Sequence, residues 1–552
     1  MTTTDSRSEY VLQKQAQLES SRTTFDAHWK EVAERILPRQ NDFQTSENTE
    51  GAKRSEKIFD STAVLALDRA ASAIDSLVTP SSQFYHRLDP EDEDLMEDLE
   101  VRTWLDDLNK AIFRMRYKPQ ANFASQAHEC YISLMAFGTD TLFTEDVPGV
   151  GAHYKSCPMS EIYLAENQYG MVDYLHRKFP LTARAAKQKW GNELPEAILK
   201  AAEKEPFRKF DFIHCVKPND EMNSKRKDYR GMPITSYYVS VEGKKFLSEG
   251  GYRVRPYSVG RHVTAPREVY GRSPAMQVLA DIKMLNEMEK TIIRAAHKIV
   301  DPPLLVYGDG ILTSFNTRPN ALNYGGVDDQ GRQMVVPLKT GSNLPIAEDK
   351  AEQKRKMIND AFYVTLFQIL VENPRMTATE AMIRAQEKGQ LLAPTVGRQQ
   401  SEWLGAVIDR DIDIIMTSGM VRPPPDSLLE SGGGIKVNYT SPLSRLRRAE
   451  DGVAIMRTIE QITPLANAKP EILDNFDTDI IARELSEING APPKIMRSIE
   501  AIVAMREQRE EAMAQQAQMQ QAEMAANAAR NGAKAAETIE GLGGLGAIED
   551  AA

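Results

Sequence analysis

The sequence has few cysteines and no long hydrophobic run, and each shortage excludes a class of protein. Its 552 residues include only three cysteines, with no C-x-x-C pair, which argues against a disulfide framework and against a thiolate metal site. The longest uncharged apolar stretch, Ala361 to Val371, has 11 residues, whereas a membrane-spanning helix needs roughly 20. The first ten residues are polar and carry two acids, unlike a signal peptide. We therefore expect a protein made in the cytoplasm, without membrane contact, whose Cys130, Cys157 and Cys215 are small core residues.

Positive charge is also in short supply. The chain has 68 Lys and Arg residues against 79 Asp and Glu residues, for a net charge of -11. This sign is opposite to that of proteins that grip phosphates, so if DNA is a partner, tight groove binding is not the mode. At roughly 150 residues per domain the length suits three or four packed units, and 41% hydrophobic with 27% charged residues is an ordinary globular composition.

The motifs of the common enzyme sites are absent. The chain has no G-x-x-x-x-G-K-[ST] phosphate loop, no H-E-x-x-H among its eight histidines and no G-x-S-x-G elbow. Gly541, Gly543 and Gly546 match the outer glycines of a dinucleotide-binding pattern. They lie in a Gly/Ala-rich tail with no strand before them, so a flexible end is the simpler interpretation. We expect no catalytic residue and no cofactor.

Two acidic patterns and one histidine resemble ligand sets only superficially. Asp409, Asp411 and Asp413 match the opening of a calcium loop, but the surrounding pattern is helical, and residues two apart on a helix point about 200° apart. The acidic run at 91–100 is typical of a solvated helix start. His214 lies in an alternating apolar pattern, which predicts an inward-facing strand residue. We expect no metal site.

Helical patterns dominate the start of the chain, and strand patterns follow. Apolar residues from Trp29 to Ile36 share one helix face before Pro38, and a second helix is expected from about Asp60 or Ser61 to Val78. Between about 138 and 263 the signals are strands and turns. The expected strands are 162–164, 171–175, 236–241, 244–247 and 252–257, the last after a turn at Gly250-Gly251. This predicts an antiparallel sheet with short helices inside an α+β, mostly α, fold.

A small module is expected between two long helices. Ser273 is suited to cap a helix that begins at Pro274, and the helical period continues to Val300, a span of about 40 Å. A second helix is expected over Glu348 to Val371, with an exposed first half and a packed second half. The intervening segment contains strand-like pieces at 304–307 and 334–337. Its expected boundaries are Pro302, Pro303 and Pro345.

A charged stripe runs along the first of these helices. Its basic members are Lys283, Lys290, Arg294 and Lys298. A solvated helix face is the simpler interpretation of this pattern.

The last third of the chain is expected to be helical, with one further strand. A capping box at 377–380 starts a helix that ends near Leu392, and 393–397 is expected to be a short connection. A helix from Gln399 to Ser418 ends at Gly419, and Ile435 to Tyr439 is expected to be a strand. Further helices are broken by prolines. The Ala/Gln-rich stretch from Ser498 to Arg530 predicts a helix that Asn531-Gly532 ends.

The sequence resembles the portal, or head-to-tail connector, proteins of short-tailed, T7-like (podovirus) bacteriophages. The most specific part of the likeness is Glu372-Asn373-Pro374-Arg375-Met376-Thr377-Ala378-Thr379-Glu380. The other matching positions are Trp29 to Pro38, Phe59 to Ala63, Thr79-Pro80, Phe137-Gly138, Tyr270 to Pro274, Asp281-Ile282-Lys283, Leu285-Asn286, Pro302-Pro303, Arg384, Glu387, Leu391-Leu392, Arg398, Glu402, Arg410 and Gly419. Beyond about Ala449 the chain matches only in character.

The resemblance implies a portal fold assembled as a ring around a central channel. The parts it implies are a wing at 1–269, stem helices at 270–300 and 347–372, a clip at 301–346, a tunnel loop with a long helix and a returning wing strand at 373–446, a crown at 447–497, and a C-terminal helix with a flexible tail at 498–552, which can form a barrel. It implies a channel-facing tunnel loop at Lys388, Gly389, Pro394, Gly397 and Arg398.

The resemblance also implies a function and partners. The ring, a dodecamer, would be the vertex channel through which double-stranded DNA is packaged and ejected. The implied partners are further copies of the chain, the major capsid protein, the scaffolding protein, the large terminase subunit, the tail adaptor and internal core or ejection proteins. Twelve copies at -11 sum to -132, which suits a pore that lets phosphates slide. The alternatives are a helical scaffold or adaptor protein without a pore, and a DNA-processing enzyme.

Overall fold

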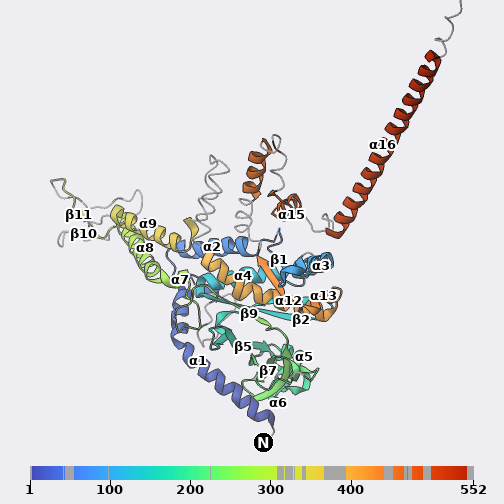
Figure 1. The fold of residues 1–552 in the computed structure, drawn as a ribbon. Helices are drawn as coiled ribbons and strands as arrows, with labels where there is room; N and C mark the ends of the chain where they lie inside the picture. The colour runs from blue at the N-terminus through green and yellow to red at the C-terminus, as the bar shows by residue number, and fades with distance from the viewer. Residues whose placement is uncertain are drawn as a thin grey trace, which may run out of the picture. The chain divides into compact units, whose positions relative to one another are not determined.

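The structure is a computed structural model, and its described residues form a mostly helical α+β fold, as predicted (Figure 1). It describes residues 3–40, 43, 55–81, 83–96, 98–223, 225–306, 316, 322, 327, 330–338, 344–365, 393–439, 452–464, 469, 475–488 and 499–543. The chain divides into two compact units. The first contains Met1–Arg87, Leu108–Pro423 and Val437–Asp451, and the second contains Leu88–Asp107, Pro424–Lys436 and Gly452–Ala552.

A five-stranded antiparallel sheet is the largest sheet of the first unit. Its order is β4-β5-β6-β7-β8, which confirms the antiparallel sheet predicted between 138 and 263. The strands are β4 Ile162–Glu166, β5 Val172–Thr182, β6 Lys209–Pro218, β7 Ile234–Ser240 and β8 Lys245–Tyr252. Short helices interrupt it: η3 Met159–Glu161, α5 Ala183–Trp190, η4 Gly191–Glu193, α6 Glu196–Lys204 and η5 Tyr229–Gly231.

Both faces of this sheet are covered, because successive side chains of a strand point to opposite faces. Phe212 of β6 packs in one core cluster with Trp190 of α5 and Ile198 of α6. The next residue, Ile213, packs in a second cluster with Val11 of α1 (Thr3–Arg35). Helix α1 contacts both edge strands, β4 and β8, and therefore lies across the sheet opposite α5 and α6.

The expected strand at 252–257 is wrong. Gly250 and Gly251 lie inside β8 and pair with Ser236 and Thr235 of β7. A Cβ on Gly251 would lie 2.7 Å from the Tyr229 carbonyl oxygen, so Gly251 allows a close backbone approach within the sheet rather than a turn. The next strand, β9 (Tyr257–Arg261), begins five residues after β8 ends.

A three-stranded sheet packs beneath helices near the middle of the first unit. Its antiparallel order is β3-β2-β9, with β2 Thr139–Val147 and β3 Gly151–Ser156. It contacts α4 (Phe123–Phe137), which contacts α2 (Thr62–Val78). The predicted α1 face is buried there, and the indole Nε1 of Trp29 donates to the Phe137 carbonyl at 2.9 Å. The α1 helix ends at Arg35, before η1 (Pro38–Gln40).

The two helices with a small module between them are confirmed in outline, with corrections at their ends. Ser273 caps α7 (Pro274–Gln277), because its hydroxyl accepts from the Met276 N–H at 3.0 Å. The expected continuous helix is wrong: Val278 leaves helical geometry at φ -103° and ψ 13°, and α8 covers Leu279–Val300. The main partner changes at this point, since α7 contacts α4 most and α8 contacts α9 most, while both helices also contact α1.

The module and the second helix follow. Strands β10 (Leu304–Val306) and β11 (Val335–Pro337) pair antiparallel, close to the predicted pieces. Helix α9 covers Leu344–Ala361, so it starts four residues earlier than predicted, and a turn at 362–363 separates it from residues 364–365, which are helical again. It ends in a turn where Tyr363 has φ 60°. Phe362 and Val364 are buried, as expected for this half, and 366–371 lie outside the described residues.

The expected connection at 393–397 is also wrong, because residues 393–398 are helical. They continue into a π-helical turn, η7 (Gln399–Leu404), and then into α12 (Gly405–Ser418). Pro394 is the second described residue of this helical stretch. Gly419 ends α12 with φ 67° and donates its N–H to Ile415, as predicted. The capping box at 377–380 lies outside the described residues.

The second unit consists mainly of helices. They are η2 Glu93–Met96, the start of α3 (Leu99–Arg116), α13 Asp426–Glu430, a helix at 452–464, α15 Thr478–Ile488 and α16 Ile499–Gly543. The predicted strand is β12 (Ile435–Tyr439), which forms a two-stranded sheet with β1 (His86–Pro90). The predicted end at Asn531-Gly532 is wrong, since α16 continues to Gly543. One helical Gly costs only about 1 kcal/mol, and the alanines around it favour helix.

Candidate functional site

Three ion pairs brace the base of the α8–α9 pair, which lies side by side in Figure 1. Lys354 of α9 contacts Asp281 of α8, with 2.7 Å between Nζ and Oδ1. Arg355 of α9 contacts Asp60 at 2.9 Å and also pairs with Glu289 of α8. These charged residues tie both helices to the start of α2.

Asp60 and Asn286 hold the α2 end of this brace. One carboxyl oxygen of Asp60 accepts from the Thr62 N–H at 2.7 Å, which caps α2. Buried Asn286 of α8 accepts the N–H groups of Phe59 and Asp60 at 2.8 and 3.1 Å. Burial alone would raise the pKa of Asp60, but the hydrogen bonds from Thr62 and Arg355 hold this pKa below its ordinary value. The carboxylate is therefore the stable form at the base.

The small module begins where the proline boundaries were predicted. The Pro303 carbonyl accepts from the Leu338 N–H at 2.9 Å, directly beyond the β10–β11 pair. Pro302 precedes it in the α8–β10 connection, whereas Pro345 is the second residue of α9 and therefore belongs to the helix. Apolar residues are exposed along this end, including Val300 at 85% and Leu305 at 55%.

The four basic residues predicted on α8 do not share one environment. Lys283 pairs with Glu31 of α1. Lys290 lies 3.3 Å from Glu287 and 5.5 Å from the centre of the Phe59 ring. Arg294 and Lys298 are exposed. The first two basic groups are therefore engaged within the chain, and the last two face solvent toward the β10–β11 end of the helix.

The predicted tunnel-loop residues are only partly within the described chain. Lys388 and Gly389 lie outside it, whereas Pro394, Gly397 and Arg398 are part of the helical stretch that leads into η7. The Arg398 guanidinium donates to the Thr264 hydroxyl at 2.5 Å and lies 3.8 Å from Glu402. In this conformation Arg398 is occupied by partners of its own chain.

Arg261 of β9 organises the same region, and sequence reasoning missed it. Its guanidinium donates to both carboxyl oxygens of Glu402 in η7, at 3.0 and 3.1 Å, and pairs with Glu166 of β4. It also donates to the carbonyls of Val269 and Gly170 at 3.2 and 3.1 Å. Glu402 is one of the positions that carry the resemblance to portal proteins, and this match was the sequence signal that could have pointed to the contact. Five bonds on one side chain fix η7 against both sheets.

A second missed cluster surrounds Arg116 and Asp411. Arg116 of α3 donates to Asp411 of α12 at 2.6 Å and to the Tyr85 hydroxyl at 2.9 Å. The Tyr154 hydroxyl donates to the other Asp411 oxygen at 2.6 Å. Burial raises the pKa of Asp411, and Arg116 offsets part of that rise. Asp413 pairs instead with Arg410, so Asp411 and Asp413 have different partners.

No catalytic arrangement is present among the residues that the structure describes. All three cysteines are buried, as expected, and no cluster of metal-ligating side chains occurs in the described ranges. His214 faces the interior and bonds Tyr257 and Ser236, as predicted for a strand residue. Burial lowers the pKa of His176 to about 3. None of the described helices has the length and apolar character needed to cross a bilayer.

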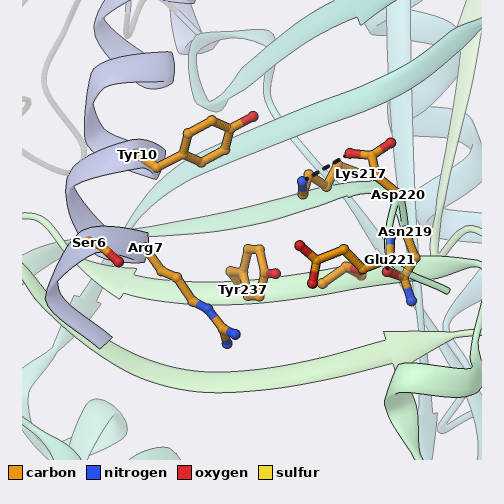
Figure 2. Close-up of a pocket in the computed structure, with 9 residues that line it drawn as sticks. Ser6, Arg7, Tyr10, Lys217, Asn219, Asp220, Glu221 and Tyr237 are labelled. Atoms are coloured by element: carbon orange, nitrogen blue, oxygen red, sulfur yellow. Dashed lines mark hydrogen bonds and ion pairs between the residues drawn. The ribbon is translucent and has the colours of Figure 1, made fainter. Parts of the chain in front are cut away.

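A polar pocket of about 250 Å³ lies between the start of α1 and the ends of β6 and β7 (Figure 2). Its charged side chains are largely paired: Lys217 lies 3.4 Å from Asp220, and Arg7 lies 2.8 Å from Glu249. The mixture of signs favours no single class of ligand.

The similarity of the chain to known proteins identifies its family. The family model for the bacteriophage head to tail connecting protein matches residues 8–496. The chain is 27% identical over 495 residues to the probable portal protein of Bordetella phage BPP-1, covering 88% of each chain, and 28% identical over 514 residues to the portal protein of Salmonella phage epsilon15, covering 91% of each. A solved chain from the virion of a native gene transfer agent particle matches with a TM-score of 0.34 and 12% identity, over 72% of this chain and 85% of that one. The chain belongs to the family of bacteriophage head to tail connecting proteins, and its role is the structural one of a portal or connector.

Proposed function

We propose that this chain forms a closed ring at one capsid vertex, the channel through which double-stranded DNA enters the capsid and later leaves it. Family membership and the names of the two phage relatives support the proposal. The observation that carries it is that helices α8 and α9 flank the β10–β11 pair. Contacts of Arg355, Lys354 and Asn286 hold the base of these two helices. A braced helix pair with an exposed tip suits a stem that holds a docking module away from the body.

The parts of the ring follow from this assignment. The wing is 1–269, the stem helices are 270–300 and 347–372, and the clip is 301–346. The segment 373–446 supplies the tunnel loop, the long helix and the returning wing strand, 447–497 the crown, and 498–552 the C-terminal helix. The 13 alanines among the 45 residues of α16 suit packing against copies of itself as a barrel.

Charge supports passage of DNA without tight binding. A subunit charge of -11 gives a ring that repels phosphates overall. Arg294 and Lys298 are exposed on α8 and can make local, exchangeable contacts with phosphates or with acidic groups of a neighbouring subunit. Such contacts are screened by salt, which keeps each of them weak.

Each part then has a partner of its own. The clip docks the large terminase subunit during packaging and the tail adaptor afterwards, and its exposed Leu305 and Val336 give it apolar contact area. The wing contacts the major capsid protein and the scaffolding protein, and the crown contacts internal core or ejection proteins. The chain is a virion component made in the host cytoplasm.

Electron microscopy and native mass measurement of the purified chain test the ring. A ring with a central hole, twelve subunits by mass, is the expected result. A monomer at micromolar concentration, unaffected by salt or by scaffolding protein, would contradict it.

Replacing residues 304–337 by a short Gly/Ser linker tests the clip separately. Arg355 and Lys354 remain in place, so the ring should still form, and the particles should fail to fill with DNA or to acquire tails. Particles that fill and acquire tails normally would show that the clip assignment is wrong.

A further inference from the structure

Asp140 is a buried carboxyl group with no cation beside it. It lies in β2 with no solvent exposure, and neither carboxyl oxygen has a hydrogen-bond partner in another described residue. Its register partner in β9 is Gly260, which carries no side chain. Its own backbone N–H favours the ionised form, but an ionised carboxylate with no other donor among the described residues is costly in such a place, since most of its lone pairs lose water without replacement.

Gln399 supplies an oxygen that matches this carboxyl group. It is the first residue of η7 and is fully buried, and its Nε2 donates to the Arg261 carbonyl at 3.1 Å. Its Oε1 has no partner among the described residues. A Cβ added to Gly260 would overlap Asp140 Oδ1 and lie 2.6 Å from Gln399 Oε1. Both oxygens therefore lie near the same point above Gly260. A hydrogen bond between two acceptor oxygens needs a proton on one of them.

The groups around Asp140 also favour its neutral form. The negative charge of Glu402 in η7 raises the pKa of Asp140. The Tyr131 phenol and the Cys130 thiol of α4 also interact with Asp140, and neither carries a positive charge. The Arg261 guanidinium of β9 forms ion pairs with Glu402 and Glu166. His262, the next residue, is buried, and burial lowers its pKa to about 4. Burial first, and then Glu402, raise the pKa of Asp140 well above its ordinary value.

We infer that Asp140 is a protonated acid that donates its hydrogen bond to Gln399 Oε1 and thereby fixes the first turn of η7 to β2. Asp140 is a positioning residue in this arrangement, since it acts through the π-helical turn. A π-turn carries one extra residue relative to an α-helix, so its register needs specific contacts of this kind. The inference does not rest on the channel function.

The proton links this contact to pH. Because the folded-state pKa of Asp140 is raised, the folded chain binds a proton that the unfolded chain has released. The contribution to stability is complete below the ordinary Asp pKa of 3.8 and is lost as pH rises toward the folded value. Within that window the unfolding equilibrium constant increases up to tenfold per pH unit.

Asp140→Asn tests this inference, because the amide keeps a donor in place and carries no charge. Unfolding of the full chain by urea would be measured from pH 4 upward for both proteins. The expected result is a ratio of wild-type to variant unfolding constants that rises with pH by up to tenfold per unit. Asp68→Asn, which removes the same charge at an exposed position of α2, should give a flat ratio. A flat ratio for Asp140→Asn, or a variant far less stable at every pH, overturns the inference.

Two further measurements keep the inference testable if that variant does not fold. Gln399→Leu removes the acceptor, so it should destabilise the chain more at low pH, where Asp140 is protonated, than at high pH. Equal destabilisation at both would contradict the bond. Infrared spectroscopy of the unaltered protein at neutral pH should show the carbonyl stretch of a protonated carboxylic acid, and its absence also overturns the inference.

Discussion

Arg116 and Asp411, separated by 295 positions in the sequence, form a 2.6 Å ion pair in which neither side chain is exposed to solvent. Tyr85 and Tyr154 complete the cluster. The pair joins α3 to α12, two helices far apart along the chain. Its burial makes it more sensitive to substitution than any exposed ion pair of the molecule.

Removing one partner of this pair should be strongly destabilising. Arg116→Met leaves the Asp411 carboxylate buried without its cation, and we expect a loss of about 3–5 kcal/mol in the free energy of unfolding, measured by urea denaturation. The double variant Arg116→Met with Asp411→Leu should recover part of this loss, because no charge then remains buried. A double variant less stable than the sum of the single changes would contradict this account.

The base of the α8–α9 pair should weaken in acid. The pKa of Asp60 is lowered in the folded chain, so its stabilising contribution is present above the ordinary value of 3.8 and is lost as pH falls below it. Asp60→Asn keeps an oxygen to cap α2 but loses the charge that Arg355 contacts, and should cost about 1 kcal/mol. The cost should disappear at low pH, whereas Asp60→Ala also removes the cap and should cost more at every pH.

Two glycines in the same region should respond to alanine in opposite ways. Gly260→Ala would overlap Asp140 Oδ1 and should destabilise by about 1–3 kcal/mol, since the site is buried and has no room. Gly397 lies in a helical stretch, and nothing lies within 4 Å of an added Cβ. Gly397→Ala should therefore stabilise by roughly 0.4–1 kcal/mol. A loss of stability at Gly397 would instead favour the short connection expected from the sequence at 393–397.

Lys388 and Arg398 test the proposed tunnel loop. If the segment contacts DNA as proposed, changing each to Ala should preserve ring assembly and alter DNA retention or packaged length, because a weak phosphate contact would be lost. Since Arg398 also contacts Thr264 and Glu402, Thr264→Val serves as a control that loosens Arg398 without removing its charge. Normal genome retention in both single variants and in the double variant would leave the segment without a DNA role.

Local signals in the sequence were reliable where a feature depends on neighbouring residues. The Ser273 cap, the Gly419 helix end, β12 and the inward-facing His214 each follow from a few adjacent side chains. The same reasoning failed at Val278, which interrupts the helix, and at Gly250-Gly251, which pair with β7 inside the sheet. Arg116 and Arg261 carry no local pattern at all, because their partners come from up to 295 residues away. Such contacts follow from topology, which propensity alone does not specify.

The position of α1 across the five-stranded sheet has a consequence for how the chain folds as it is synthesised. Val11 leaves the ribosome early, but it packs against Ile213 and Val239, which emerge roughly 200 residues later, a delay of about 10–40 s at ordinary elongation rates. During that delay α1 has no sheet to cover. Contacts of such long range slow folding and expose apolar surface to aggregation. A binding protein that shields the nascent α1, or one that holds the finished sheet until α1 docks, would therefore raise the yield of native subunits.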